Sequence, residues 1–310
     1  MVKWVSRTRF RRAGKRRRRR GRWTNLLTGR GYPRGAIVAS WPCYRVRDGC
    51  LTARSVGCLH LTVARRSDYL LIDVSNSYAK LAFASRERVS NPARIPTSEL
   101  SSSVVAEFLR RRQVKKLVVS SVVPAKNAAI SKAARNKAQV LWLDWKLKLG
   151  VKIDYPKPES IGADRLANAA AVAELYGWPA IVVDFGTAVT FDVVSEGCRY
   201  IGGVIAPGLE AVTNFLYQKT ALLPRLSLKE PHRAVGKSTV EAMRSGAIFG
   251  YRGLVREILA RIKAEQFSRK KVAVVATGGY ARLIASHLPE VAVIHPHLTL
   301  EGLRIVGSLN

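Results

Sequence analysis

The sequence predicts a duplicated α/β fold with mixed sheets, and three observations lead to this prediction. The apolar run LLIDV at Leu70–Val74 has a close counterpart in IVVDF at Ile181–Phe185. Each run carries an aspartate near its end, passes through a turn of small residues and continues into a second apolar run. From residue 68 onward, patterns typical of strands and helices alternate, in two halves of comparable length that meet near Pro179.

The first half predicts a hairpin followed by two helix and strand pairs. The first helix is expected to begin with Ser98 as its N-cap, because an apolar face follows it, formed by Val104, Val105, Phe108 and Leu109. The segment KKLVVSSVV reads as a buried strand, and proline in a first turn favours the second helix. The expected bounds are Tyr69–Val74, Tyr78–Ala84, Ser98–Arg112, Pro124–Ala138 and Gln139–Leu143.

The second half opens after VKIDY, a short strand that leads through a proline-bounded loop into an alanine-rich helix closed by Gly177. The second hairpin follows at once. Beyond YIGGVIAPGLEAVTNFL we expect a helix from Ser238 to about residue 264, the strand KVAVVATGG, a helix ending at His287, a strand at Val291–Ile294 and a terminal helix.

Charge divides the chain into a basic head and a body. Of the 53 lysines and arginines, 19 lie in residues 1–66, where Asp48 is the single acid. The head therefore carries +18 and the remainder +14 of the net charge of +32. We expect a head at residues 1–66, a first domain at 67–179 and a second domain at 180–310.

The head contains RFRRAGKRRRRRGRW, a charge block without apolar periodicity that predicts disorder in isolation. Four interpretations stay open. The block is typical of a tail for nucleic acid or another anionic surface, and of an organelle transit segment. An upstream start codon in an arginine-rich reading frame, with the true start near Val63, is slightly favoured over these. A metal site from Cys43, Cys50, Cys58 and His60 is disfavoured, because close cysteine pairs are lacking.

The body contains a single cysteine, Cys198, which excludes an internal disulfide framework and favours a reducing cytoplasm. No apolar stretch approaches the roughly 20 residues that a membrane-spanning helix needs. The sequence therefore predicts a cytoplasmic protein without a membrane partner.

The two hairpins carry the residue types that phosphate binding needs. The GxxxxGK[ST] pattern of a P-loop is absent, and each turn leads from strand into strand. Small residues in both turns allow backbone N–H groups to approach an anion: Ser75, Asn76, Ser77, Gly186 and Thr187. Asp73 and Asp184 at the strand ends are placed to hold a cation or a metal-bound water. Two such hairpins facing each other could hold a triphosphate.

Between the hairpins lies GADR, Gly162–Arg165, at the start of the alanine-rich helix. The helix dipole predicts that Asp164 stays ionised at neutral pH. Arg165 offers a fork for a carboxylate. The alternative is an ordinary first-turn aspartate beside a solvated arginine.

With these motifs in view, the body resembles a type III pantothenate kinase, of the actin-like, sugar-kinase and heat-shock ATPase superfamily. The resemblance covers residues 67–310. It rests on an ordered set of segments: DVSNS, GADR, VVDFGTAVTFDVV, YIGGVIAPGL, TALLP, GKSTVEAMRSGAIFG, ATGGYARLIASHLP and HLTLEGL. It implies a two-domain actin-like, ribonuclease H-like fold and the ATP-dependent phosphorylation of pantothenate to 4'-phosphopantothenate, the first step of coenzyme A biosynthesis.

The resemblance also implies roles for individual residues. Asp164 becomes the proton acceptor, and Asp184 the ligand of potassium or ammonium. Asp73 lies near magnesium. The ATP-binding set is Asp73, Val74, Ser75, Asn76, Ser77, Tyr78, Ala79, Lys80 and Thr187. The pantothenate-binding set is Tyr155, Gly162, Ala163, Asp164, Arg165 and Thr239, although Tyr155 and Thr239 read equally well as packing or capping residues. A homodimer is implied as well.

One departure from the family pattern concerns the first turn, where Ser75 replaces a glycine and Ser77 a threonine. If the turn requires positive φ at Ser75, serine costs roughly 1 kcal/mol. Two rivals therefore stand beside the kinase: a regulatory binding protein with the same fold, and a nucleic-acid-associated protein driven by the arginine block. The joint presence of Asp73, Asp164, Arg165, Asp184 and Thr187 favours the kinase.

Overall fold

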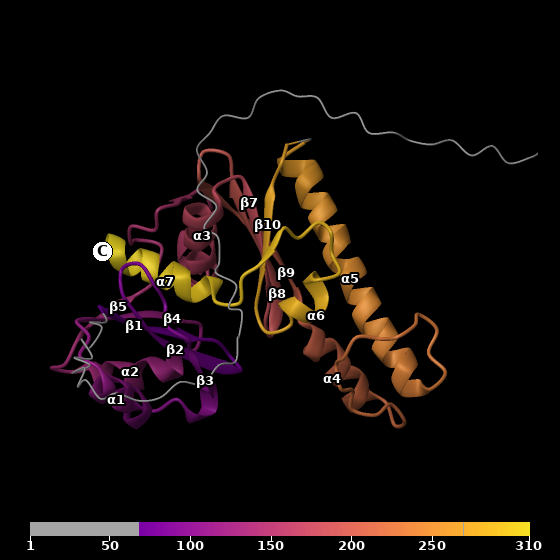
Figure 1. Ribbon diagram of the computed structural model, residues 1–310, viewed down its shortest axis with the longest axis horizontal. Helices are drawn as coiled ribbons and strands as arrows, with labels where there is room; N and C mark the ends of the chain where they lie inside the picture. The colour runs from indigo at the N-terminus through magenta and orange to yellow at the C-terminus, as the bar shows by residue number, and fades with distance from the viewer. Residues whose placement is uncertain (1–67, 269) are drawn as a thin grey trace, which may run out of the picture. The chain divides into compact units, whose positions relative to one another are not determined.

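The computed structural model describes residues 68–268 and 270–310, so the basic head and its candidate metal ligands lie outside the described residues. The described chain forms two sheets (Figure 1). The first has the strand order β3-β2-β1-β4-β5, and the second β11-β10-β7-β8-β9-β6. The strands are β1 (Tyr69–Val74), β2 (Tyr78–Ala84), β3 (Ala93–Pro96), β4 (Lys116–Ser121), β5 (Gln139–Trp142), β6 (Lys152–Ile153), β7 (Ala180–Phe185), β8 (Ala188–Ser195), β9 (Arg199–Pro207), β10 (Ala273–Thr277) and β11 (Val293–Ile294).

The two sheets repeat one topology. In the first, β1, β2 and β3 form an antiparallel meander, and β4 and β5 extend it in parallel from β1. In the second, β7, β8 and β9 form the meander, and β10 and β11 extend it in parallel from β7. The short β6 adds one parallel strand beside β9. The predicted duplication with mixed sheets is confirmed.

Helices cover both faces of the first sheet, because alternate residues of β1 are buried on opposite sides. Leu70 and Ile72 pack in one core with residues of α1 and α2, whereas Leu71 packs in another with α3 and α7. The helices are α1 (Ser102–Arg111), α2 (Asn127–Ala134), α3 (Ala163–Tyr176), α4 (Leu209–Lys219), α5 (Thr239–Gln266), α6 (Ala281–Ala285) and α7 (Leu298–Leu309). Three short 3₁₀ turns occupy Thr97–Glu99, Pro124–Lys126 and Pro158–Ser160.

The second sheet follows the same rule. Ile181 and Val183 of β7 pack against α5 and α6, while Val182 packs in the core that contains α3 and α7. The helices α3 and α7 therefore share one core with strands of both sheets.

Close packing of α3 on α7 depends on a glycine. A Cβ atom at Gly302 of α7 would lie 2.0 Å from the backbone oxygen of Ala167 in α3. No side chain fits at that distance, so the glycine allows the two helix backbones to approach each other. This contact matters for the site, because Asn168 follows Ala167 directly.

Some predicted element ends are wrong. The first helix has Ser101 as its N-cap, with its Oγ accepting from the Val104 N–H at 3.4 Å, and Ser98 lies in the 3₁₀ turn before it. The second helix ends at Ala134, four residues early, because Asn136 adopts a left-handed backbone conformation with φ 58°. The helix predicted to reach His287 ends at Ala285, and the last strand covers Val293–Ile294 alone.

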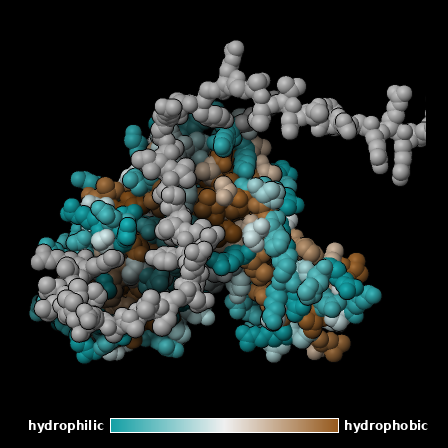
Figure 2. Space-filling view, viewed as in Figure 1, coloured by the Kyte–Doolittle hydropathy of each residue, from teal (hydrophilic) through white to brown (hydrophobic). Residues whose placement is uncertain are grey.

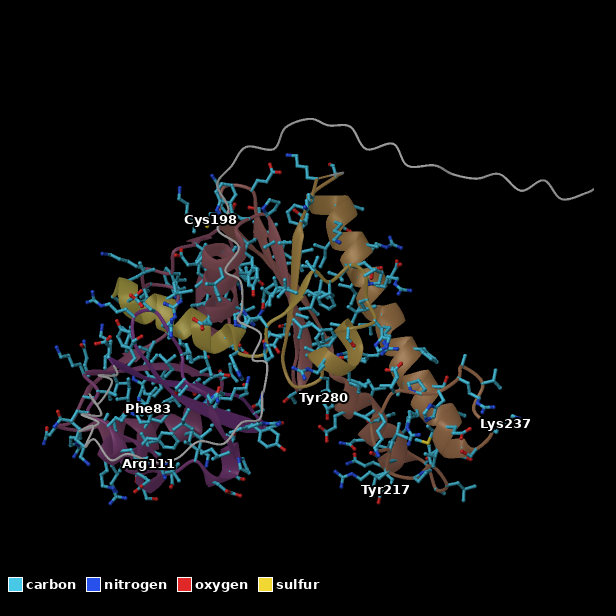
Figure 3. The ribbon with its side chains drawn as sticks, in the orientation of Figure 1. Phe83, Arg111, Cys198, Tyr217, Lys237 and Tyr280 are labelled. Atoms are coloured by element: carbon cyan, nitrogen blue, oxygen red, sulfur yellow. The ribbon has the colours of Figure 1, made fainter. Side chains whose placement is uncertain are left out.

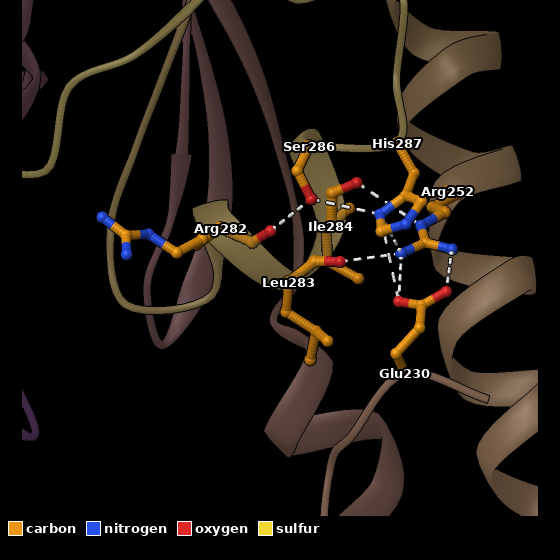
Figure 4. A network of polar contacts seen from close by, with 7 residues as sticks. All are labelled: Glu230, Arg252, Arg282, Leu283, Ile284, Ser286 and His287. Atoms are coloured by element: carbon orange, nitrogen blue, oxygen red, sulfur yellow. Dashed lines mark hydrogen bonds and ion pairs between the residues drawn. The ribbon is translucent and has the colours of Figure 1, made fainter. Parts of the chain in front are cut away.

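A charged network fixes the segment between α4 and α5 (Figure 4). The buried Arg252 of α5 donates from two nitrogens to both carboxylate oxygens of Glu230, at 2.9 and 2.6 Å, which holds the pKa of Glu230 below its ordinary value. The same guanidinium donates to the Leu283 carbonyl at 2.8 Å. The segment that precedes Thr239 is thereby anchored to α5 and to α6.

In the part of the chain that the structure describes, every helix is too short or too polar to span a bilayer.

Candidate active site

The two hairpins meet at their turns. The hydroxyl oxygens of Ser77 and Thr187, one from each turn, lie 3.0 Å apart in a hydrogen bond. The first turn is also held by the residue after β3, since the Thr97 hydroxyl donates to the Ser75 carbonyl at 2.6 Å. The structure therefore brings together two loops that lie far apart in the sequence, as the duplicated hairpin predicts.

Asp73 is the fifth residue of the buried strand β1 and faces Lys80 across the hairpin. The Lys80 Nζ lies 3.9 Å from the Asp73 Oδ2, and the two residues are register partners. Burial raises the pKa of Asp73 to about 6, the Lys80 ammonium opposes this rise, and Asp164 and Asp184 add to it. The Asp73 Oδ1 makes no hydrogen bond of regular geometry among the described residues, although the adjacent Ser120 hydroxyl on β4 lowers the pKa of Asp73.

Asp184 occupies the corresponding position on β7. The Asn168 amide of α3 donates to its Oδ2 at 3.3 Å. Its Oδ1 lies under Gly278, where an added Cβ would be 2.5 Å from that oxygen and where φ is +93°. Burial raises the pKa of Asp184, although Lys80 and the Asn168 hydrogen bond act against this rise.

The residues present fit a cation beside Asp184 and Asp73. The Asp73 Oδ1 is a buried oxygen without a regular hydrogen bond that a cation or its water would satisfy, and the Asn168 amide engages only the Oδ2 of Asp184, which leaves the Oδ1 to face a cation. Carboxylate oxygens are the ligands that hard cations prefer. Within residues 68–268 and 270–310, no group of three or more acidic, histidine or cysteine side chains could hold a metal alone.

Asp164 lies in the first turn of α3, after Gly162 as the N-cap. Its Oδ1 accepts from the Arg165 backbone N–H at 2.9 Å. Burial and the nearby Asp184 raise its pKa, and these outweigh the backbone and the Arg165 charge. The sequence reasoning weighed the helix dipole alone, and the net direction of the shift is the opposite. A Cβ at Gly162 would lie 2.6 Å from the Asp164 Oδ1, so the glycine leaves room for this carboxylate.

Arg165 is engaged with a residue that sequence reasoning missed. Its Nε donates to the Oδ1 of Asp192 on β8 at 2.7 Å, and that oxygen also accepts from the Tyr200 hydroxyl at 3.2 Å. Asp192 is fully buried, which raises its pKa to about 7 against the opposing effect of Arg165. The guanidinium lies over the Tyr200 ring. Asp192 thus fixes one edge of the predicted carboxylate fork.

Tyr155 packs beside this pair. Its ring centroid lies 6.3 Å from that of Tyr200, and a Cβ at Gly202 would lie 3.2 Å from its Cε2 atom. Gly202 has φ +114°, so two independent reasons favour glycine there. Tyr155, Tyr200 and Arg165 therefore form one aromatic and cationic group near the start of α3.

Thr239 is not brought to the other predicted residues. It is the exposed first residue of α5, where Ser238 accepts from the Glu241 N–H at 3.2 Å and Glu241 accepts from the Lys237 N–H at 2.7 Å. Its neighbour Lys237 projects outward at the lower right of Figure 3. No hydrogen bond or ion pair among the described residues joins Thr239 to Tyr155, Asp164 or Arg165.

Ser75 has an ordinary backbone. In the described part of the chain the non-glycine residues with positive φ are Asn136, Cys198 and Ser268. The strain that would follow from positive φ at Ser75 is therefore absent, and serine fits this turn.

Three polar residues of the site escaped prediction. Asp192 sits within an apolar strand, and a buried charge in such a run signals a partner. Asn168 sits among buried alanines of α3, and Thr299 contacts it from α7. Only Asp192 and Asn168 carried a usable signal, as polar residues in apolar surroundings.

Comparison with known proteins agrees with this geometry. The family model for type III pantothenate kinase matches residues 69–261. The type III pantothenate kinase of Akkermansia muciniphila is 50% identical over 244 residues, 78% of this chain and 99% of its own length. That of Methylacidiphilum infernorum is 42% identical over 240 residues, 77% of this chain and 88% of its own.

Among solved structures, a Sinorhizobium meliloti protein assigned as a 2-dehydro-3-deoxygalactonokinase superposes with a TM-score of 0.51. It is 13% identical, and the match covers 77% of this chain and 95% of that one, which supports the fold alone. The predicted actin-like fold, family and enzyme class are confirmed. The chain belongs to the type III pantothenate kinase family.

Proposed function

We propose that this chain transfers the γ-phosphoryl group of ATP to the hydroxyl of pantothenate at the site between its two hairpins. One observation carries the proposal. The Ser77 and Thr187 turns meet within 3.0 Å, above aspartates whose charges influence one another. Loops of this kind, together with a cation, are what a polyphosphate needs, because phosphoryl transfer depends chiefly on positioning and charge neutralisation.

ATP is held by Asp73–Lys80 on one side and Thr187 on the other. The exposed Asn76 and Ser77 offer polar groups at the first turn, and Thr187 offers a hydroxyl at the second. Lys80 faces Asp73 and also lowers the pKa of Asp184. Its ammonium therefore supplies positive charge where the phosphates gather negative charge.

Asp164 accepts the proton of the pantothenate hydroxyl. Its raised pKa supports this role, because a carboxylate with a pKa closer to neutral pH is a stronger proton acceptor. In a loose transition state the proton leaves late, so a carboxylate is basic enough. The Arg165 backbone N–H holds the Oδ1, and the Oδ2 is the oxygen that we assign to the hydroxyl proton.

Pantothenate is held by Gly162–Arg165 and Tyr155. Arg165 uses its Nε for Asp192, which leaves the remaining guanidinium nitrogens for the pantothenate carboxylate. Tyr155 covers the apolar part of the substrate. Thr239 contributes only if the start of α5 approaches pantothenate in the assembled protein.

Two cations complete the site. Asp184 holds potassium or ammonium, and Asp73 lies near magnesium. Bound there, they would neutralise phosphate charge as it develops.

We further propose a homodimer through α4. Its outer face exposes Val212, Phe215 and Leu216 at i, i+3 and i+4 spacing, with Phe215 59% exposed. Ile205 of β9 adds another exposed apolar side chain, 61% exposed. Figure 2 has hydrophobic surface at the lower end of α4, and Tyr217 points outward there in Figure 3. A second copy of the chain covers this face.

We also propose a boundary between two domains at Pro179 and a cytoplasmic location. The two sheets support the division, although β6 joins the second sheet and α7 packs on the first. The free Cys198 supports a reducing compartment.

The decisive experiment measures ADP release and 4'-phosphopantothenate formation by the full chain with ATP, pantothenate, magnesium and potassium. We expect turnover that depends on pantothenate and that falls when sodium replaces potassium. Turnover equal in sodium and potassium would remove the cation role of Asp184. Absence of turnover with every cation would remove the kinase proposal.

The dimer is tested by light scattering of the full chain and of Phe215→Asp. We expect a dimer mass for the wild type and a monomer mass for the variant. A wild-type monomer would contradict the proposal.

A further inference from the structure

Asp184 is held by a chain of two side chains that begins in α7. The Thr299 hydroxyl donates to the Asn168 Oδ1 at 2.9 Å, and the Asn168 Nδ2 donates to the Asp184 Oδ2 at 3.3 Å. Thr299 and Asn168 are 3% and 1% exposed. Polar side chains this deeply buried are stable only when their hydrogen bonds are made.

The carboxylate decides which way the Asn168 amide points. Reversing the amide would place its carbonyl oxygen against the Asp184 Oδ2, two acceptors in contact. With the amide as it stands, the carbonyl needs a donor on its other side, and Thr299 supplies it. A threonine hydroxyl therefore selects the amide orientation that Asp184 requires.

Helix geometry places the hydrogen-bonded side chains of Thr299 and Asn168 near Asp164, the proposed proton acceptor. Asn168 follows Asp164 by four residues, so the two side chains lie on one face of α3, a turn apart. Gly302 of α7 lies against Ala167, the residue before Asn168. Thr299 precedes Gly302 by three residues, and this close contact between α3 and α7 brings it within hydrogen-bond distance of Asn168.

We propose that Thr299 and Asn168 are positioning residues for the monovalent cation at Asp184. Asn168 fixes the Oδ2 by its hydrogen bond, which leaves the Oδ1 as the oxygen that holds the cation. This inference rests on the proposed role of Asp184 as the cation ligand. Residues that orient a metal ligand through a hydrogen bond typically change affinity by about 10–100-fold when they are altered.

Thr299→Val tests the proposal, because valine keeps the shape and removes only the hydroxyl. We expect the potassium concentration for half-maximal activity to rise about tenfold. The kcat at saturating potassium and the KM for pantothenate should change little. Thr299→Ser restores the hydroxyl and should restore the potassium constant.

A second measurement avoids turnover. In the full chain without substrates, we expect potassium to raise the melting temperature more than sodium does, and we expect Thr299→Val to lose most of that difference. Thr213→Val is the matched control, since Thr213 is a buried threonine of α4 whose hydroxyl bonds the Leu209 carbonyl. It should lower the melting temperature without changing the response to potassium.

The outcomes separate the two levels of inference. If the wild type responds to potassium and Thr299→Val responds identically, Thr299 is structural and this proposal is overturned. If the wild type shows no preference for potassium in either measurement, the cation role of Asp184 itself fails.

Discussion

The two hairpins share one backbone plan and differ in charge. Both central strands have six residues with aspartate in the fifth position, Asp73 in β1 and Asp184 in β7. Opposite Asp73 in the ladder stands Lys80, whereas opposite Asp184 stands Thr190. The first hairpin therefore places a lysine ammonium opposite its aspartate, and the second hairpin places an uncharged threonine there. The difference explains why the second aspartate, rather than the first, is the better candidate for a monovalent cation.

A second difference between the hairpins lies two residues earlier in each central strand. Leu71 of β1 faces Ala82, but Val182 of β7 faces Asp192. This buried acid has no counterpart in the first hairpin, and it pairs with Arg165. The two copies therefore differ at this matched position by one buried acid, which we propose holds Arg165 for pantothenate while both turns contact the nucleotide.

The largest effect is expected at Asp164, which belongs to neither hairpin. Asp164→Asn should lower kcat by about 10²–10⁴-fold, because the amide cannot accept the hydroxyl proton. The KM values should change little. Steady-state kinetics measures this, with the exposed Asp154→Asn as a control that keeps the wild-type rate. A loss of less than about tenfold would remove the proton-acceptor role from Asp164.

Asp192→Asn tests whether the second hairpin serves pantothenate. Weakening a buried ion pair on one side costs up to about 3–5 kcal/mol of unfolding free energy. Released from Asp192, Arg165 should also raise the KM for pantothenate more than the KM for ATP. Urea denaturation and kinetics measure the two effects. An equal change in both KM values would contradict the proposal that Asp192 and Arg165 serve pantothenate binding.

Asp73→Asn tests the electrostatic cost of the first hairpin. The folded pKa of Asp73 is raised to about 6, so the unfolded chain ionises first as pH rises and stability falls between about pH 4 and pH 6. Relative to that of the wild type, the free energy of unfolding of the variant should increase by on the order of 3 kcal/mol when the pH is raised from 4 to 8. Urea denaturation without added magnesium at both pH values measures it. A constant difference between the two proteins would contradict the raised pKa.

The smallest effect is expected where the turns differ, at Ser75 and Gly186. Ser75→Gly relieves no backbone strain, since Ser75 lacks positive φ. It should cost about 0.4–1 kcal/mol through the greater freedom of the unfolded chain. The KM for ATP should stay within about twofold of the wild-type value, the change expected when no strained conformation is relieved. A much lower KM would mean that the serine side chain crowds the phosphates.

The sequence predicted what local patterns and motifs encode, namely both hairpins, the first turn of α3 and their meeting. It missed the N-cap of α1, because Ser98, Ser101, Ser102 and Ser103 compete within one stretch and only tertiary contacts decide among them. Asn168 was missed because its hydrogen-bond donor Thr299 lies 131 residues further along the chain, and because its contact with Asp184 depends on how α3 packs against β7. Thr299 by itself is indistinguishable from any threonine in a helix.

The packing of α7 has a consequence for synthesis. Its apolar residues complete the core that holds Leu71 and Val118 of the first sheet, and Gly307 lies against Val118. A ribosome delivers this helix after every other described element. Until it emerges, the α7 residues that cover Leu71 and Val118 are missing from the core, and Asn168 lacks its hydrogen bond from Thr299. We therefore expect chains truncated before α7 to expose apolar surface and to lack the hydrogen bond that orients Asn168.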